Sequence, residues 1–338
     1  MIFRYVKGTA MMRELRRLSA ALTLALVAIV PAAAQKPVNT DYPTRPVRLI
    51  VTFAPGASND ILARLIGGKL AEEWGQNFVI DNRPGAGGAI GVNAVVKAAP
   101  DGYTLLLANS GPSVGTPMLA QNPSYSPFDF TQIIYIGYAP LVILANPAFA
   151  PKTPKELIEY AKTNPGKVSW GSSGTGSSPH IAILLFQAAT GADVTHIPYK
   201  GAVQNMTDLI GGQINLIYTT TVSSEPQIKA NRVRGIGVAA PKRVAMLPNV
   251  PTLAEYGIKD AEAGIWYGLQ GPRGMPRAVV DKLNREVNRA LAMADVKARF
   301  DQLGFESAGG TPEDFDKVVK SEVAKLDKLL KAGMIKKE

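Results

Sequence analysis

A strand, a short turn of small residues and a helix follow one another between Val47 and Leu65. The stretch 47–53 is apolar and rich in β-branched residues, which indicates a buried strand of a parallel sheet. Apolar side chains recur at helical spacing from Asp60 onward, and the turn at 54–59 ends in residue types that favour helix N-termini. Because free N–H groups at such an N-terminus attract anions, this unit predicts a site for a carboxylate.

The same unit occurs a second time further along the chain. A short strand at 168–170 leads into a turn made only of Gly, Ser and Thr at 171–178, and a helix is predicted over 179–189. Ligands of open α/β sheets bind beyond the carboxyl ends of the strands, where such turns lie. The turns at 54–59 and 171–178, carried by facing domains, therefore predict a two-sided clamp for an anion.

The order of elements predicts an α/β protein of two domains. A chain of 338 residues with 46% apolar and 19% charged residues is globular, and it is too long for one ordinary core. The apolar strand at 131–144 is predicted to leave the first domain near Ala139, and 265–269 is predicted to be the returning strand. We therefore expect a discontinuous first domain, 36–139 with 264–338, and a second domain, 140–263.

The first 34 residues have the pattern of an export signal. Five basic residues precede an apolar run at 18–30, which is followed by Pro31 and three alanines. The run is shorter than the roughly 20 residues that a membrane span needs, which disfavours a membrane anchor. We predict a signal peptide over 1–34, cleaved after Ala34, and a soluble protein exported to the periplasm.

Composition excludes several kinds of site. The chain has no cysteine, so disulfides, thiolate metal sites and cysteine nucleophiles are excluded. Its two histidines, His180 and His196, lack the spacing of a metal site and are predicted to be structural. The net charge is +10, but no basic run interleaves with aromatic residues, so nucleic acid is not a predicted partner. No cofactor and no metal are predicted.

The glycine-rich turns do not match common catalytic or nucleotide-binding motifs. Ile90 stands where the third glycine of a dinucleotide fingerprint would be, and no Gly-Lys pair is followed by Ser or Thr. In Gly171-Ser172-Ser173-Gly174 the second glycine comes one position too early for a hydrolase nucleophile. The chain is therefore predicted not to be an enzyme. Two alternatives stay open: an exported serine hydrolase using Ser110 or Ser173, and a ligand sensor for a membrane kinase.

Several aromatic residues could border a cleft. Phe53 and Trp170 adjoin the two turns, so contact with a ligand and packing in the core are both open for them. Trp266 and Tyr267 are predicted to pack in the core. Tyr199, which follows a predicted strand at 194–197, is a further candidate for ligand contact.

Six stretches together resemble one family. They are RPVRLIVTFAPGASNDILAR (45–64), NRPGAGG (82–88), AAPDGYTLL (98–106), GSSGTGSSPH (171–180), HIPYKG (196–201) and LPNVPTLAEYG (247–257). The sequence resembles the periplasmic solute-binding receptors of tripartite tricarboxylate transporters, the Bordetella uptake gene product family. The resemblance implies a Venus-flytrap fold with the ligand between two α/β domains. It also implies a small organic carboxylate as ligand and the membrane permease subunits of the transporter as partners.

The resemblance also implies which residues bind the ligand through backbone N–H groups and hydroxyls. They are Phe53, Pro55, Gly56, Ala57, Ser58 and Asp60 in the first loop and Ser172, Ser173, Gly174, Thr175, Gly176 and Ser177 in the second. Tyr199 and Thr219 are two further candidates for ligand contact. The sequence departs from the family pattern at 218–221, where Tyr-Thr-Thr-Thr replaces a frequent Phe-Asp-Asn. Because the acidic partner for an ammonium group is missing, we expect a carboxylate without a cationic group.

Overall fold

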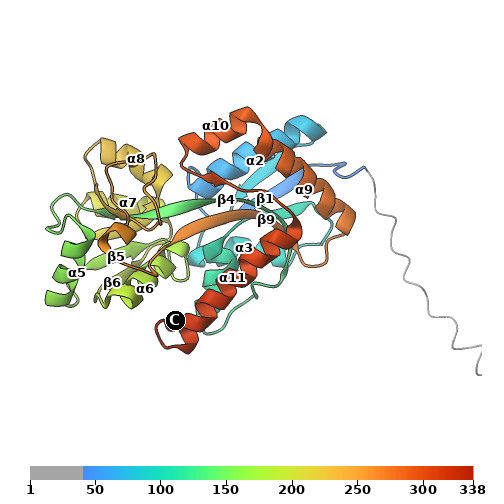
Figure 1. Ribbon diagram of the computed structural model, residues 1–338. Coiled ribbons are helices and arrows are strands. Elements are labelled where there is room, and N and C mark those ends of the chain that lie inside the picture. The colour runs from blue at the N-terminus through green and yellow to red at the C-terminus, as the bar shows by residue number, and fades with distance from the viewer. Residues whose placement is uncertain (1–40, 338) are drawn as a thin grey trace, which may run out of the picture. The chain divides into compact units, whose positions relative to one another are not determined.

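The computed structural model describes residues 41–337. The predicted signal peptide lies outside the described residues. Within them, helices alternate with strands that pair in the order β2-β1-β3-β9-β4-β7-β5-β6, with β10 and β8 joined to β4 beside this path (Figure 1). The α/β class predicted from the sequence is confirmed.

Three parallel strands and two helices follow the N-terminal lead-in. They are β1 (Val47–Val51), α2 (Ser58–Trp74), β2 (Phe78–Asn82), α3 (Ala89–Val96) and β3 (Thr104–Asn109). Four of the five β1 residues are buried, as its apolar sequence predicts. The helix α2 ends at Gly75, whose left-handed backbone (φ 62°) stops the helical pattern. The strand–turn–helix unit predicted at 47–65 is therefore present.

The segment after β3 is helical, although its small residues favour a turn when read alone. Residues 109–113 lead into the helical segment η2 (Gly111–Gly115), which continues as α4 (Thr116–Leu119). Pro112 stands in the first turn, where its missing N–H costs no hydrogen bond. This segment is buried, so packing between neighbouring elements decides its conformation.

Two long strands connect the parts of the sheet. The strand β4 (Phe130–Ala145) pairs with β9 (Gly264–Pro272) over Phe130–Pro140, and with β7 and β8 over Leu141–Ala145. Figure 1 shows β4 and β9 side by side across the middle of the molecule. These two strands therefore run between the part of the sheet that holds β1–β3 and the part that holds β5–β8.

The remaining strands lie beyond β4. They are β5 (Ser169–Ser172), β6 (Thr195–Pro198), β7 (Leu216–Thr220) and β8 (Arg234–Val238), with α5 (Pro154–Thr163), α6 (Ser178–Thr190), α7 (Ala202–Ile210) and α8 (Thr221–Lys229). We call β5–β8 and their helices the sheet B half, and β1–β3, β9 and their helices the sheet A half. In the sheet B half, β5 is parallel to both β6 and β7. The repeated unit at 168–189 is thus β5, its loop and α6.

The C-terminal helices pack on the sheet A half. They are α9 (Arg277–Ala292), α10 (Ala294–Gln302) and α11 (Pro312–Lys331), with the short strand β10 (Glu306–Ser307) between the last two. Thr311 caps α11 through a reciprocal bond pair with Asp314, as its position before Pro312 predicts. Phe315 is buried, stacks on Tyr135 with ring centres 6.1 Å apart and meets the edge of Trp266 at 5.3 Å.

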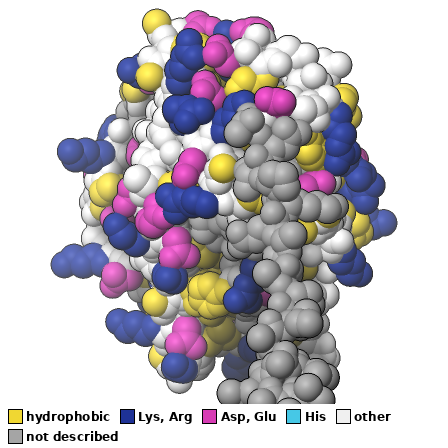
Figure 2. Space-filling model, turned by 90° about the vertical axis from the view of Figure 1, so that its right-hand side faces the viewer, with side chains coloured by type: hydrophobic (Ala, Val, Ile, Leu, Met, Phe, Trp, Pro, Cys, Tyr) yellow, Lys and Arg dark blue, Asp and Glu magenta, His cyan; other side chains and the backbone are white. Residues whose placement is uncertain are grey.

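The surface carries both signs of charge. Figure 2 shows Lys and Arg side chains interspersed with Asp and Glu over the visible part of one face. Ion pairs join the helices of the sheet A half, such as Lys69 with Asp295 at 2.9 Å and Arg289 with Glu73 at 2.7 Å. Between residues 41 and 337, no helix has both the length and the apolar character that crossing a membrane requires.

Candidate functional site

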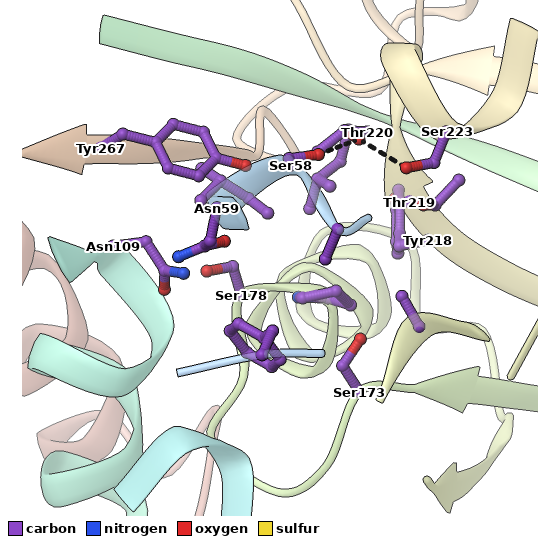
Figure 3. Close-up of a pocket in the computed structure, with 16 residues that line it drawn as sticks. Ser58, Asn59, Asn109, Ser173, Ser178, Tyr218, Thr219, Thr220, Ser223 and Tyr267 are labelled. Atoms are coloured by element: carbon purple, nitrogen blue, oxygen red, sulfur yellow. Dashed lines mark hydrogen bonds between the residues drawn. The ribbon is translucent and has the colours of Figure 1, made fainter. Parts of the chain in front are cut away.

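A pocket lies where the two halves meet, and we call it the inner pocket (Figure 3). It is a small cavity of about 50 Å³. Its lining residues are Phe53, Ala57, Ser58, Asn59, Asn109, Leu141, Ser173, Ser178, Pro179, Ala202, Tyr218, Thr219, Thr220, Ser223, Ile265 and Tyr267. They come from the β1–α2 and β5–α6 turns, from the end of β7 and from both connecting strands.

Three helices begin at the inner pocket. The N-cap residues of α2, α6 and α8 are Ala57, Ser177 and Thr220, and none of the three donates or accepts a side-chain capping bond. Their first-turn N–H groups therefore keep their capacity to bond a ligand, and their positive dipole ends converge. The sequence predicted the contributions of α2 and α6, whereas the role of α8 follows from the structure.

Buried polar atoms of the lining add to this arrangement. The Nδ2 of Asn59, the Oδ1 of Asn109 and the hydroxyl of Tyr218 are buried without a hydrogen-bond partner in the described part of the chain. Burial raises the pKa of Tyr218 and of Tyr267, so both phenols stay protonated at neutral pH. Buried polar atoms without partners are costly, and a ligand with acceptor oxygens would satisfy the two donors among them, Nδ2 of Asn59 and the Tyr218 hydroxyl. The Oδ1 of Asn109 is an acceptor and would bond a donor of the ligand, such as a hydroxyl.

The lining contains no charged side chain. An anionic guest would therefore be held by backbone N–H groups, hydroxyls and helix dipoles. A ligand with an ammonium group would meet no carboxylate on the pocket wall. Thr219 and Thr220 stand at the end of β7, and the sequence has no acidic residue there. Electrostatics thus favour an acid without a cationic group.

Asp60 stabilises the first loop through hydrogen bonds from outside the inner pocket. Its carboxylate accepts hydrogen bonds from the Gly56 N–H at 3.0 Å, from Arg64 at 2.9 Å and from Asn82 at 3.1 Å. Burial works against the charged form, but these donors outweigh it and hold the pKa of Asp60 below its ordinary value. Neither Asp60 nor Pro55 lines the inner pocket. The structure thus places Asp60 as a residue that positions the loop.

Two histidines hold the second loop. The Gly176 N–H donates to Nδ1 of His180 at 3.1 Å, and Nε2 of His196 lies 2.6 Å from the Ser172 hydroxyl. The two imidazole rings stack with centres 3.9 Å apart. Burial lowers the pKa of His180 to about 4, so it is neutral at pH 7. The structure therefore gives both histidines a structural role, and Ser172 is fully buried away from the pocket.

The outer side of the second loop contacts the sheet A half. A Cβ built on Gly176 would lie 2.5 Å from Cα of Thr116, and one built on Gly87 would overlap the carbonyl oxygen of Thr175. Gly174 and Thr175 line a separate groove there together with Tyr199, whose hydroxyl donates to Asp208 at 2.7 Å. These three predicted residues therefore face away from the inner pocket.

The structure brings part of the predicted set together. Phe53, Ala57, Ser58, Ser173 and Thr219 line the inner pocket, and Gly56 lines a neighbouring chamber. Ser177 is buried with its hydroxyl unbonded in the described residues, at the N-cap of α6.

Sequence reasoning assigned some aromatic and polar residues differently. Trp170 is fully buried and stacks on Tyr218 at 5.0 Å, outside the lining, whereas Tyr267, predicted to be core, lines the pocket. Asn59, Asn109, Ser178, Tyr218, Thr220 and Ser223 were missed. Most of them adjoin predicted turns or strand ends, and that adjacency was the available signal.

No cluster of three or more His, Asp or Glu residues suited to a metal occurs in residues 41–337.

Comparisons with known proteins agree with this geometry. The model of the tripartite tricarboxylate transporter family receptor matches residues 62–334. The protein BugT of Bordetella pertussis is 35% identical over 288 residues, covering 84% of this chain and 88% of the relative.

Two solved structures of similar proteins carry named small molecules. Rpa4515 of R. palustris with adipate is 34% identical, covers 86% of this chain and 97% of that one, and superposes with a TM-score of 0.81. MatC from Rhodopseudomonas palustris with bound malate is 31% identical, and the match covers 86% of this chain and 100% of that one, with a TM-score of 0.81. Both compounds are organic acids.

Proposed function

Because this chain belongs to the family of tripartite tricarboxylate transporter receptors, we propose that it binds a small organic carboxylate in the inner pocket and delivers it to the permease subunits of such a transporter. The family consists of solute-binding receptors, so the chain is a receptor and not an enzyme. The exported serine hydrolase considered from the sequence is therefore set aside.

The convergence of three uncapped helix N-termini carries the proposal. The first turns of α2, α6 and α8 meet at the inner pocket, and the unpartnered Asn59 and Tyr218 supply further donors. A carboxylate has about four lone-pair sites and can accept from several such donors at once. Hydrogen bonds to a charged acceptor contribute roughly 1.5–3 kcal/mol each, which suffices for micromolar binding after the costs of ordering.

The ligand is proposed to be a carboxylate without an ammonium group. The relatives with bound malate and adipate carry acids of this kind, and the uncharged lining agrees with it. The residues that we propose to touch the ligand are Phe53, Ala57, Ser58, Ser173 and Thr219 from the sequence prediction, with Asn59, Tyr218 and Thr220 from the structure.

Capture is proposed to couple to closure of two domains, 36–139 with 264–338 and 140–263. The segments that connect them cross near Ala139 and Gly264, where a Cβ on Gly264 would overlap the ring of Tyr138. Two crossing strands allow a small change of backbone angles to move one half against the other. We also propose that residues 1–34 are a signal peptide that is removed on export to the periplasm.

The test is the variant Tyr218→Phe, with Tyr256→Phe as its control. Tyr218 keeps its stacking on Trp170 as phenylalanine and loses only a buried hydroxyl without a partner in the described chain. We expect the unliganded protein to be as stable as the parent or more so, and carboxylate affinity measured by calorimetry to fall about tenfold or more. Tyr256 is 40% exposed and lies outside the pocket, so its variant should bind as the parent does.

The ligand is first found by a thermal-shift screen of residues 35–338 against carboxylates, amino acids and sugars. A ligand present at a hundredfold its Kd adds about 2.7 kcal/mol and raises the Tm by a few degrees. If amino acids or sugars stabilise the protein and carboxylates do not, the proposed function is wrong. If carboxylates bind equally to Tyr218→Phe, the proposed site is wrong.

A further inference from the structure

The inner pocket adjoins a larger space, which we call the outer chamber. The two share the lining residues Phe53, Ala57, Ala202, Thr219 and Ser223, and the outer chamber has a volume of about 670 Å³. A ligand whose carboxylate is held at the helix N-termini would therefore extend past Phe53 into the chamber.

One wall of the outer chamber is an apolar face of α7. Val203, Met206 and Ile210 stand at spacings of three and four residues, which places them on the same face of that helix. Met206 and Ile210 pack partly against the sheet B core, whereas Val203 is 63% exposed. Phe53 and Pro84 of the sheet A half also line the chamber. The apolar surface is thus contributed by both halves.

The charges at the chamber are of one sign. Lys200 and Arg232 are the charged residues among those that line it, and both are exposed. Two exposed cations on the wall raise the local concentration of anions and disfavour cations. The chamber therefore combines apolar walls with positively charged lining residues, and it adjoins the inner pocket.

We propose that the outer chamber is a second subsite, which takes the apolar body of the ligand. This inference rests on the proposed function and narrows the class of ligand to carboxylic acids with a hydrocarbon part. The ligand is a carboxylic acid with a ring or alkyl chain, whose acid group lies in the inner pocket and whose hydrocarbon part lies between Phe53 and the α7 face of Val203, Met206 and Ile210. Short hydroxylated acids leave this apolar surface uncovered and bind less tightly.

The test is calorimetry with the linear acids acetate, butyrate, hexanoate and octanoate, with malate and 1-hexanol for comparison. We expect Kd to fall by roughly fourfold for each methylene that enters the chamber, which corresponds to the transfer of a buried CH₂ from water. The variant Val203→Gln should reduce this dependence on chain length and leave acetate affinity unchanged. The matched control is Val79→Gln, because Val79 is 51% exposed on β2 and lines neither space.

The outcomes separate this inference from the proposed function. If malate or acetate binds and chain length has no effect, or if Val203→Gln and Val79→Gln give the same dependence, the apolar subsite is wrong and the carboxylate site stands. If 1-hexanol binds as tightly as hexanoate, or if no acid of any length binds, both proposals are wrong.

Discussion

The hydroxyl oxygens of Ser58 and Thr220 lie 3.0 Å apart, although 162 residues separate them in the chain. Ser58 opens α2 in the sheet A half, and Thr220 is the N-cap of α8 in the sheet B half. Figure 3 shows this bond at the wall of the inner pocket. It joins two of the helix N-termini that form the site, so it links ligand binding to the contact between the halves.

Replacing Thr220 with valine removes this bond, together with the 3.3 Å bond from Thr220 to the Ser223 hydroxyl, and keeps the shape of the side chain. A neutral hydrogen bond contributes about 0.5–1.5 kcal/mol, so we expect carboxylate affinity to fall roughly two- to tenfold in calorimetry. Thr163→Val is the control, because the Thr163 hydroxyl bonds only within its own helix end, to Glu159 and Tyr160 carbonyls and to Asn164. Equal affinity for both variants would show that the contact does not support binding.

Alanine at Gly115 tests the contact between the second loop and the sheet A half. Gly115 has a helical backbone (φ −61°, ψ −52°), so alanine brings no backbone strain there. Its Cβ would overlap Ile181 and the carbonyl oxygen of Gly176. We expect Gly115→Ala to weaken carboxylate binding and to increase the radius of gyration in small-angle scattering, because the halves cannot approach fully.

The control for that variant is Gly68→Ala. Gly68 lies within α2, and a Cβ there meets nothing within 4 Å. Alanine should raise the free energy of unfolding by up to about 1 kcal/mol through helix propensity and leave binding unchanged. If Gly115→Ala binds carboxylate as well as Gly68→Ala does, close approach at Gly115 is not needed for binding.

The burial of His180 predicts that the folded protein loses stability in mild acid. Its pKa in the folded protein is about 4, below the ordinary 6.5, because burial disfavours the charged ring. The unfolded chain therefore binds more protons, so the contribution of this group is complete above pH 6.5 and is lost as pH falls toward 4. The loss reaches about 3 kcal/mol at pH 4.

Denaturant unfolding at pH 7, 5.5 and 4 measures this effect in the parent and in His180→Gln. The variant lacks the titrating ring, so its free energy of unfolding should fall less steeply with acid. Groups distant from His180 titrate equally in both proteins, so the difference between the two profiles reports on His180 and the His196 ring stacked on it. Parallel pH profiles would contradict the assignment.

Asp60 should affect the site without touching the ligand. In Asp60→Asn the negative charge that accepts from Gly56 and Arg64 is lost, and we expect the free energy of unfolding to fall by about 2 kcal/mol. Affinity should fall as well, because the loop carrying Phe53 and Ala57 loses its support. Glu72→Gln on the same helix is the control, since the Glu72 side chain is 70% exposed and its variant should unfold as the parent does. An unchanged stability of Asp60→Asn would contradict this role.

Local sequence patterns predicted most elements because their signals are local. The apolar stretch 47–53 contains β1, Gly75 ends α2, and Thr311 caps α11. The helix α10 and the helical start at Gly111 were missed. Small residues near 109–113 favour a turn when read alone, but burial against neighbouring elements favours compact helical backbone.

The sequence by itself determined the α/β class, the two glycine- and serine-rich loops and the family. The reason is that hydrophobic periodicity, turn chemistry and motifs depend on residues that are neighbours in the sequence. Only the tertiary structure decided which side of each loop faces the pocket. It turned Ser173 inward and Thr175 outward, placed Asp60 behind its loop and added the N-terminus of α8. The physical reason is that these outcomes depend on pairing and close approach between segments far apart in the chain, such as Ser58 with Thr220, which no local pattern encodes.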